Sequence, residues 1–185
     1  MAAVREELGD LDGEIVGIGP IVAAATAAEI IARRQPSAVV LLGTGGAYAG
    51  GPAIGEAVSG SRVGMSYGVA AMGLGYVPRP PGPVSCDESL IERIGLAAHP
   101  VLTVGAVTTD PQLAARLSDG WTVEHMEAFG VALACQQAGV PFACVLGVTN
   151  DVGPEAHTQW LAHRDAAQAA ARDAVRHLAD APEAP

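Results

Sequence analysis

Apolar runs alternate with segments of helical character along most of the chain, and this alternation predicts the architecture. Residues 38–42 are all apolar, which is typical of a strand in a sheet that is covered on both faces. Pro20 fits the first turn of an Ala-rich helix that runs to residue 34, and residues 157–178 have the pattern of an amphipathic helix. Further strands are expected at residues 14–18, 101–107 and 142–148. Strands alternating with helices predict an α/β fold with a mostly parallel central β-sheet covered by helices, in a single domain over residues 1–185.

The remaining segments have weaker patterns. Residues 1–12 are charged and predict a helix with Val4, Leu8 and Leu11 on one face. Residues 54–65 indicate weak strands, residues 67–84 form a Gly- and Pro-rich excursion, and short helices are expected at residues 87–95 and 111–117. No internal repeat divides the chain.

The most informative segment is residues 123–151, in which a strand end leads into an apolar helix, a Gly-Val-Pro turn and a second strand. Glu127 opens the helix, and Asn150 follows Thr149 at the end of the second strand. In open α/β sheets, ligands bind beyond the carboxyl ends of the strands. Burying a carboxylate in an apolar helix costs free energy unless a group donates hydrogen bonds to it. Glu127 and Asn150 are therefore candidate site residues. A structural role is the alternative for each, because the helix dipole favours a Glu in a first helical turn and an Asn suits a turn.

These residues resemble the purine nucleoside phosphorylase and nucleosidase superfamily. The resemblance rests on Val-Glu-x-Met-Glu-Ala at 123–128, Gly-Val-Pro-Phe at 139–142 and Thr-Asn at 149–150, and it extends over residues 13–178. Among the members, the nucleosidases are most similar, namely methylthioadenosine/S-adenosylhomocysteine nucleosidase and, nearer still, futalosine hydrolase.

The resemblance implies a role for each part of the site. It assigns Glu127 to the ribose hydroxyls, Met126 to packing against the sugar, and the Gly-rich stretch at 43–46 to the ribose and base pocket. Asn150 would assist departure of the base: adenosine-type nucleosidases have Asp there, whereas the Asn amide suits the 6-oxo group and N7 of hypoxanthine. Catalytic roles are thus expected for Asn150 and Glu127, and substrate binding for Thr44, Gly45, Gly46, Met126, Thr149, Phe129 and Trp160. Ordinary packing remains an alternative for Trp160 and the neighbouring His157, a tight turn for the Gly-rich stretch, and a structural role for His125.

The resemblance also predicts water as the nucleophile. Hexameric phosphorylases carry a phosphate-binding Arg just ahead of the Gly-rich loop, where this chain has Leu41 and Leu42. In the nucleosidases, a Glu after the first strand activates the water, and that strand would lie upstream of Met1. Either the start is assigned too late, or this chain lacks the strand and its water-activating Glu, in which case Glu6 and Glu7 are the fallback candidates. The expected activity is hydrolysis of a 6-oxopurine nucleoside; a phosphorylase and a catalytically silent nucleoside-binding protein are the alternatives.

The composition excludes several classes of partner and of chemistry. The net charge of −10 argues against nucleic acid and anionic membranes as partners. All ten basic residues are Arg, so Schiff-base and P-loop lysine chemistry is excluded. Cys86, Cys135 and Cys144 lack metal-ligand spacing, and we expect neither a metal nor a cofactor. The absence of a signal peptide or a long apolar run indicates a cytoplasmic protein, and the resemblance implies a homo-oligomer.

Overall fold

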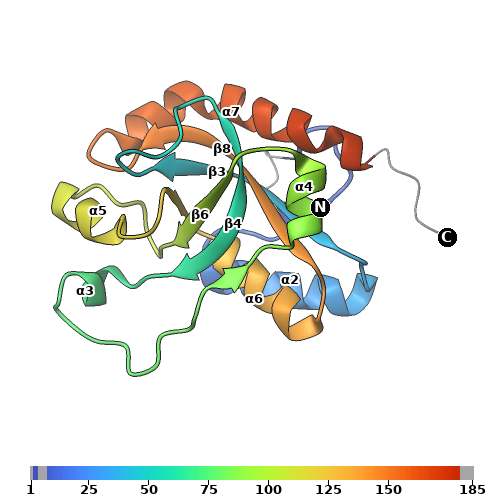
Figure 1. The fold of residues 1–185 in the computed structure, drawn as a ribbon, viewed down its shortest axis with the longest axis horizontal. Coiled ribbons are helices and arrows are strands. Elements are labelled where there is room, and N and C mark those ends of the chain that lie inside the picture. Colours follow the sequence, from blue (N-terminus) through green and yellow to red (C-terminus); the bar gives the residue numbers. More distant parts are fainter. Residues whose placement is uncertain (1, 4–7, 180–185) are drawn as a thin grey trace.

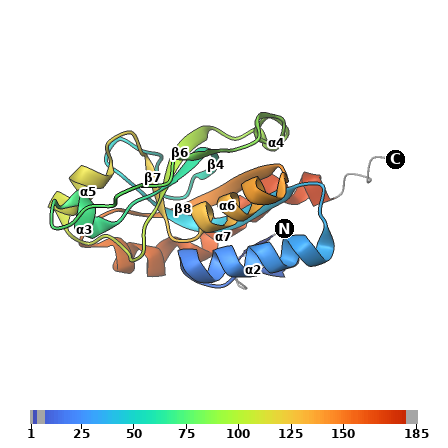
Figure 2. The same cartoon turned by 90° about the horizontal axis from the view of Figure 1, so that it is seen from below.

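A central β-sheet with helices on both faces forms the body of the protein (Figure 1). The computed structural model describes residues 2–3 and 8–179. Helix α7 (Ala156–Ala179) crosses one face of the sheet, and α2 (Pro20–Arg34) and α6 (Ala128–Ala138) cover the other. Figure 2 shows α2 and α6 packed side by side. The expected α/β class is confirmed.

The sheet has a mixed topology. Its strands are β1 (Ala2–Ala3), β2 (Glu14–Ile15), β3 (Val39–Ala47), β4 (Ala57–Met65), β5 (Val84–Ser85), β6 (Ala98–Thr103), β7 (Val123–His125) and β8 (Phe142–Asp151). The longest parallel pairing joins β3 to β8, and β4 and β6 are also parallel. Antiparallel pairs join β3 to β7, β4 to β5 and β4 to β8, whereas the other five pairs of described strands are parallel, so the mostly parallel sheet expected from the sequence is confirmed.

Five strands close into a ring. The neighbours of β3 include β7 and β8, while β6 pairs with β7 and with β4, which pairs in turn with β8. This closure brings the ends of β3, β7 and β8 together. Gly46 of β3 pairs with Glu124 of β7 on one side and with Asn150 of β8 on the other.

A glycine permits the close packing of α2 on α6. A Cβ atom at Gly130 would lie 2.4 Å from the backbone oxygen of Pro20, which is the first residue of α2. The two helices therefore pack closely at the start of α2. Through this contact the N-terminus of α2 lies against the first turn of α6.

Smaller helices lie around the edge of the sheet. They are α3 (Gly68–Ala71), α4 (Glu88–Ile94) and α5 (Pro111–Leu117), of which α3 lies in the Gly- and Pro-rich excursion that extends from the body (Figure 1). Asp87 and Asp110 cap α4 and α5 by accepting hydrogen bonds from the backbone N–H groups of Leu90 and Leu113. Within residues 2–3 and 8–179, no helix has the length and apolar character needed to cross a membrane.

The N-terminal expectation needs correction. Ala2 and Ala3 do not form a helix but the short strand β1, which lies between β2 and β3. Ala2 pairs with Glu14 and with Leu41, so pairing to the sheet overrides the high helix propensity of alanine. Val4, Glu6 and Glu7 lie outside the described residues.

Candidate active site

A pocket of about 710 Å³ lies where the ends of β3, β7 and β8 meet the first turns of α7. Eight of the residues expected at the site line it: Thr44, Gly45, Gly46, Met126, Glu127, Thr149, Asn150 and Trp160. The other lining residues are Ile18, Val107, Thr109, Glu124, His125, Ala156, His157, Arg164, Asp165 and Gln168. Residues from both ends of the chain therefore share one cavity.

Phe129 is the expected site residue that lies elsewhere. It is buried in the main hydrophobic core and does not line the pocket. Two residues after Glu127 on the helix, its side chain points in a different direction from that of the carboxylate. Its backbone N–H donates to Thr103 Oγ1 across 2.9 Å, which helps to fix the start of α6.

Glu127 is held by groups on both of its carboxylate oxygens. The backbone N–H of Gly19 donates to Oε1 across 2.7 Å, and His125 Nε2 lies 3.4 Å from Oε2. Gly19 is the N-cap of α2, where backbone N–H groups have no intrahelical partner and the helix dipole favours an anion. A backbone N–H and a helix dipole thus stabilise the buried carboxylate, and it retains lone pairs for a ligand.

Glu124 is the second buried carboxylate of the pocket. Its Oε2 accepts from the Tyr48 hydroxyl across 2.8 Å, and its Oε1 accepts from the backbone N–H of Thr108 across 3.0 Å. Burial, together with the neighbouring Glu124 charge, raises the pKa of Tyr48 well above its usual value. Tyr48 therefore remains a hydroxyl donor, and Glu124 ties β7 to the residue that follows β3 and to the segment after β6.

Asn150 lies at an irregularity between β3 and β8. Gly45 pairs with Val148 and Gly46 with Asn150, so Thr149 is an extra residue in the β8 strand. Such a bulge re-aims the neighbouring side chains. The Thr149 hydroxyl lies 2.8 Å from Asn150 Oδ1 and 3.2 Å from the Gly45 carbonyl oxygen.

The amide of Asn150 has a defined orientation. Its Nδ2 donates to the backbone carbonyl of Asp151 across 3.0 Å. Because a carbonyl only accepts, this contact places the NH₂ group on the Asp151 side and Oδ1 on the Thr149 side. One N–H of the amide remains for a ligand.

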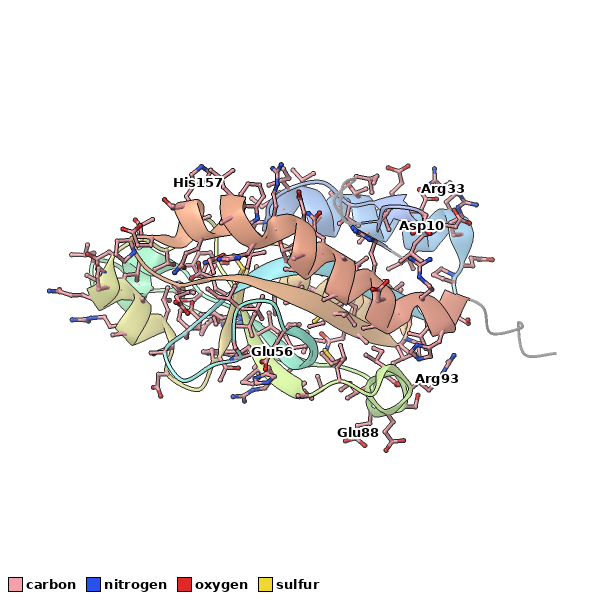
Figure 3. All side chains as sticks on the ribbon, turned by 90° about the horizontal axis from the view of Figure 1, so that it is seen from above. Asp10, Arg33, Glu56, Glu88, Arg93 and His157 are labelled. Carbon is pink, nitrogen blue, oxygen red and sulfur yellow. The ribbon has the colours of Figure 1, made fainter. Side chains whose placement is uncertain are left out.

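Helix α7 supplies the opposite wall of the pocket. The ring of Trp160 stacks with His157 at a centroid distance of 6.0 Å, and the Arg164 guanidinium lies 5.2 Å from the Trp160 ring. Arg164 also pairs with Asp165 across 3.1 Å. Figure 3 shows His157 at the N-terminal end of α7, where this helix passes over the sheet.

Sequence reasoning missed the part of this wall beyond Trp160. Arg164 and Gln168 follow Trp160 at intervals of four residues, so they lie on the same helical face. That spacing was a signal available in the sequence. Ile18 and Val107 had no such signal, because they reach the pocket only through the docking of α2 and of the segment after β6.

Metal binding has no support in this geometry. Among residues 2–3 and 8–179, no group of three or more His, Cys, Asp and Glu side chains is arranged to hold a metal ion. His125 and Glu127 are in contact, but His125 Nδ1 already accepts from two backbone N–H groups.

The fold is an α/β architecture with a pocket at the ends of its strands, which is where open α/β sheets place small-molecule sites. A family model described as the Phosphorylase superfamily matches residues 13–181. The chain belongs to this superfamily, which confirms the resemblance deduced from the sequence.

Three known proteins illustrate the relationship. A futalosine hydrolase of Thermus thermophilus is 32% identical over 179 residues, covering 89% of this chain and 79% of the relative. A 5′-methylthioadenosine/S-adenosylhomocysteine nucleosidase of Anoxybacillus flavithermus is 28% identical over 175 residues, covering 82% and 75%. The crystal structure of the corresponding Neisseria meningitidis nucleosidase, in complex with methylthio-immucillin-A, has the same fold with a TM-score of 0.79. It is 22% identical, and the match covers 94% of each chain.

Proposed function

We propose that the protein is a purine nucleoside N-ribohydrolase that cleaves the N-glycosidic bond of a 6-oxopurine nucleoside, of the futalosine type, with water. Its relatives are named hydrolases and nucleosidases, so the chain is an enzyme that acts on N-glycosyl bonds. The observation that supports the choice of base is Asn150, whose amide shares the pocket with the Glu127 carboxylate.

Glu127 has the role of stabilising the sugar in the transition state. Cleavage of an N-glycosidic bond gives the ribose oxocarbenium character, and a carboxylate that accepts from the ribose hydroxyls gains strength as positive charge develops. The Gly19 N–H fixes one oxygen of this carboxylate from outside the sugar site. Glu127 is therefore oriented before a substrate binds, which lowers the cost of reorganisation during reaction.

Asn150 has the role of assisting departure of the base. Negative charge develops on the purine as the bond breaks, and the N–H of Asn150 that Asp151 leaves available can donate to the purine O6 or N7. The 6-amino group of adenine is itself a donor and would face the N–H donor of Asn150. The arrangement thus favours a hypoxanthine base over adenine.

Water is the proposed nucleophile. Leu41 and Leu42 occupy the place of the phosphorylase Arg and are buried in β3. Arg164 is the specific observation that favours a phosphorylase, because it places a guanidinium on the pocket wall. That guanidinium pairs with Asp165, however, and it lies over Trp160.

Product analysis distinguishes these functions. Purified protein is incubated with futalosine or inosine, with and without phosphate, and the products are separated by chromatography. The proposal expects hypoxanthine and the free sugar in both conditions. A strict phosphate requirement with a sugar-1-phosphate product would establish the phosphorylase, and binding without base release would establish the silent binding protein.

We further propose that the protein is a homo-oligomer. Ile18, Ile21 and Val107 are exposed by 66%, 83% and 55%, and two of them, Ile18 and Val107, also line the pocket. Large apolar side chains gathered beside a site are suited to burial against a second copy. Light scattering should give a mass of at least twice the 18.6 kDa of one chain, and a mass of one chain would overturn the proposal.

A further inference from the structure

His125 contacts both the first turn of α6 and the Glu127 carboxylate. It is the last residue of β7, and Glu127 follows as the N-cap of α6. The side chain of Glu127 makes no capping hydrogen bond to its own helix. The carboxylate is consequently available to the pocket, and another group must cap α6.

His125 Nδ1 supplies that cap. It accepts from the backbone N–H of Glu127 across 3.1 Å and from that of Ala128 across 3.0 Å. Since Nδ1 accepts from two N–H groups, it carries no proton, and the neutral ring has its proton on Nε2. Burial lowers the pKa of His125 and Glu127 opposes that shift, so the neutral ring is favoured.

The remaining nitrogen faces the carboxylate. Nε2 lies 3.4 Å from Glu127 Oε2, whereas the Gly19 N–H donates to Oε1. Contacts of this length in unliganded sites tighten when a substrate is bound. The backbone of β3 leaves room for the ring, because a Cβ at Gly43 would lie 2.7 Å from Nε2.

We propose that His125 is a positioning residue, which caps α6 through Nδ1 and directs the Glu127 carboxylate at the ribose through its Nε2–H group. The inference rests on the proposed function, since it gives Glu127 the ribose hydroxyls. His125 is thus a second donor to the carboxylate, in addition to the Gly19 N–H. Each carboxylate oxygen is then fixed from one side and presents its other lone pair to the sugar.

Two substitutions separate the roles of the two ring nitrogens of His125. His125→Asn retains an acceptor near Nδ1 but has no donor near Nε2, whereas His125→Gln retains a donor near Nε2 but lacks the capping acceptor. We expect His125→Asn to keep a Tm near that of the wild type and to lower kcat by about tenfold to a hundredfold, the range for a hydrogen bond to a charged group. KM should change little. His125→Gln should lower Tm further yet retain more activity per folded molecule.

A matched control and a double-mutant cycle test the route of the effect. His163→Asn makes the same change on the exposed side of α7, outside the pocket, and should leave kcat unchanged. Combining His125→Asn with Glu127→Gln should cost little more than Glu127→Gln alone, because His125 acts through that carboxylate. Additive losses, or a wild-type kcat in His125→Asn, would overturn the proposal.

A measurement independent of activity tests the geometry. Nitrogen-15 correlation spectra of the full chain should show an Nε2–H tautomer for His125. The His125 signals are assigned as those missing from the spectrum of His125→Asn. An Nδ1–H tautomer would overturn the inference whatever the enzyme does. If the wild type releases no base from any purine nucleoside while the Nε2–H tautomer is found, the proposed function fails and the capping geometry stands.

Discussion

The backbone N–H of Gly19 donates to Glu127 Oε1 across 2.7 Å, although the two residues lie 108 positions apart in the sequence. This contact joins the N-terminus of α2 to the first turn of α6. It gives a buried carboxylate a backbone hydrogen-bond donor and a favourable helix dipole. The candidate site is therefore built from the docking of two helices as much as from strand ends.

Glu127→Gln should remove most of the activity with a small effect on folding. Glutamine can still accept from Gly19 through its carbonyl oxygen, while its NH₂ group would face the Nε2–H group of His125, a donor against a donor, so a modest loss of stability is expected. The lost charge is felt mainly in the transition state, so kcat should fall by about a hundredfold or more with little rise in KM. Steady-state kinetics and thermal unfolding of the same preparation measure both effects. A large loss of stability with normal activity per folded molecule would instead make Glu127 structural.

Gly130→Ala tests the helix contact that places Gly19. Alanine is favoured over glycine in a helix by about 1 kcal/mol, so propensity alone predicts stabilisation. The new Cβ would meet the Pro20 carbonyl at 2.4 Å, and overpacking of this kind costs about 1–3 kcal/mol. We expect a net loss in the free energy of unfolding, measured in urea, and a lower kcat because α2 is displaced.

Gly82→Ala is the matched control for that change. Nothing lies within 4 Å of a Cβ at Gly82, and the same substitution there should leave stability and kcat near the wild-type values. If Gly130→Ala were as stable and as active as Gly82→Ala, the docking of α2 would not be what positions the Glu127 carboxylate.

Several parts of the site follow from the sequence, and the others depend on tertiary contacts. Glu127 and Asn150 were predicted because polar residues at the ends of apolar elements collect where strands end. The Gly19 donor was not predicted, because it depends on how α2 packs against α6. Phe129 was misplaced because sequence proximity to Glu127 did not show which face of the helix it occupies.

The fold shows the same division. The apolar run within β3 predicted a central strand, and its parallel pairing with β8 follows from alternating strands and helices. Ala2 and Ala3 were expected to be helical because the segment around them is rich in helix-forming residues. Pairing with β2 and β3 is a non-local contact, and a local pattern does not report it.

Stability should fall on mild acidification because His125 is neutral in the folded protein. Burial holds the pKa of His125 below its ordinary value of 6.5, and the nearby Glu127 only partly opposes this. The unfolded chain then binds a proton that the folded chain does not, so stability is complete above pH 6.5 and is lost as the pH falls towards the folded pKa. The slope should reach at most about 1.4 kcal/mol per pH unit.

Urea unfolding between pH 7.5 and 5.5 checks this, with His125→Asn as the comparison. The variant keeps the other four histidines and should lose less stability over the same range. Parallel pH profiles for the two proteins would contradict a neutral, buried His125.

Base choice should depend on Asn150, and Asn150→Asp should change it. The wild type should prefer hypoxanthine over adenine nucleosides by at least roughly tenfold in kcat/KM, since leaving a buried polar group unpaired costs about 1–3 kcal/mol. Aspartate would place an oxygen against the Asp151 carbonyl that Nδ2 now contacts at 3.0 Å, which favours a protonated carboxyl. Such a group accepts from a 6-amino group and can supply a proton to N7, so the preference should narrow or reverse.

The measurement is kcat/KM for matched inosine- and adenosine-type substrates in both proteins. Asp151→Asn serves as the control, because it changes the charge of the adjacent, exposed side chain and keeps the backbone carbonyl that orients Asn150. It should leave the ratio of the two substrates near the wild-type value. An equal preference in the wild type, or the same ratio after Asn150→Asp, would show that Asn150 does not read the base. In that case the 6-oxopurine specificity would have to come from another part of the pocket.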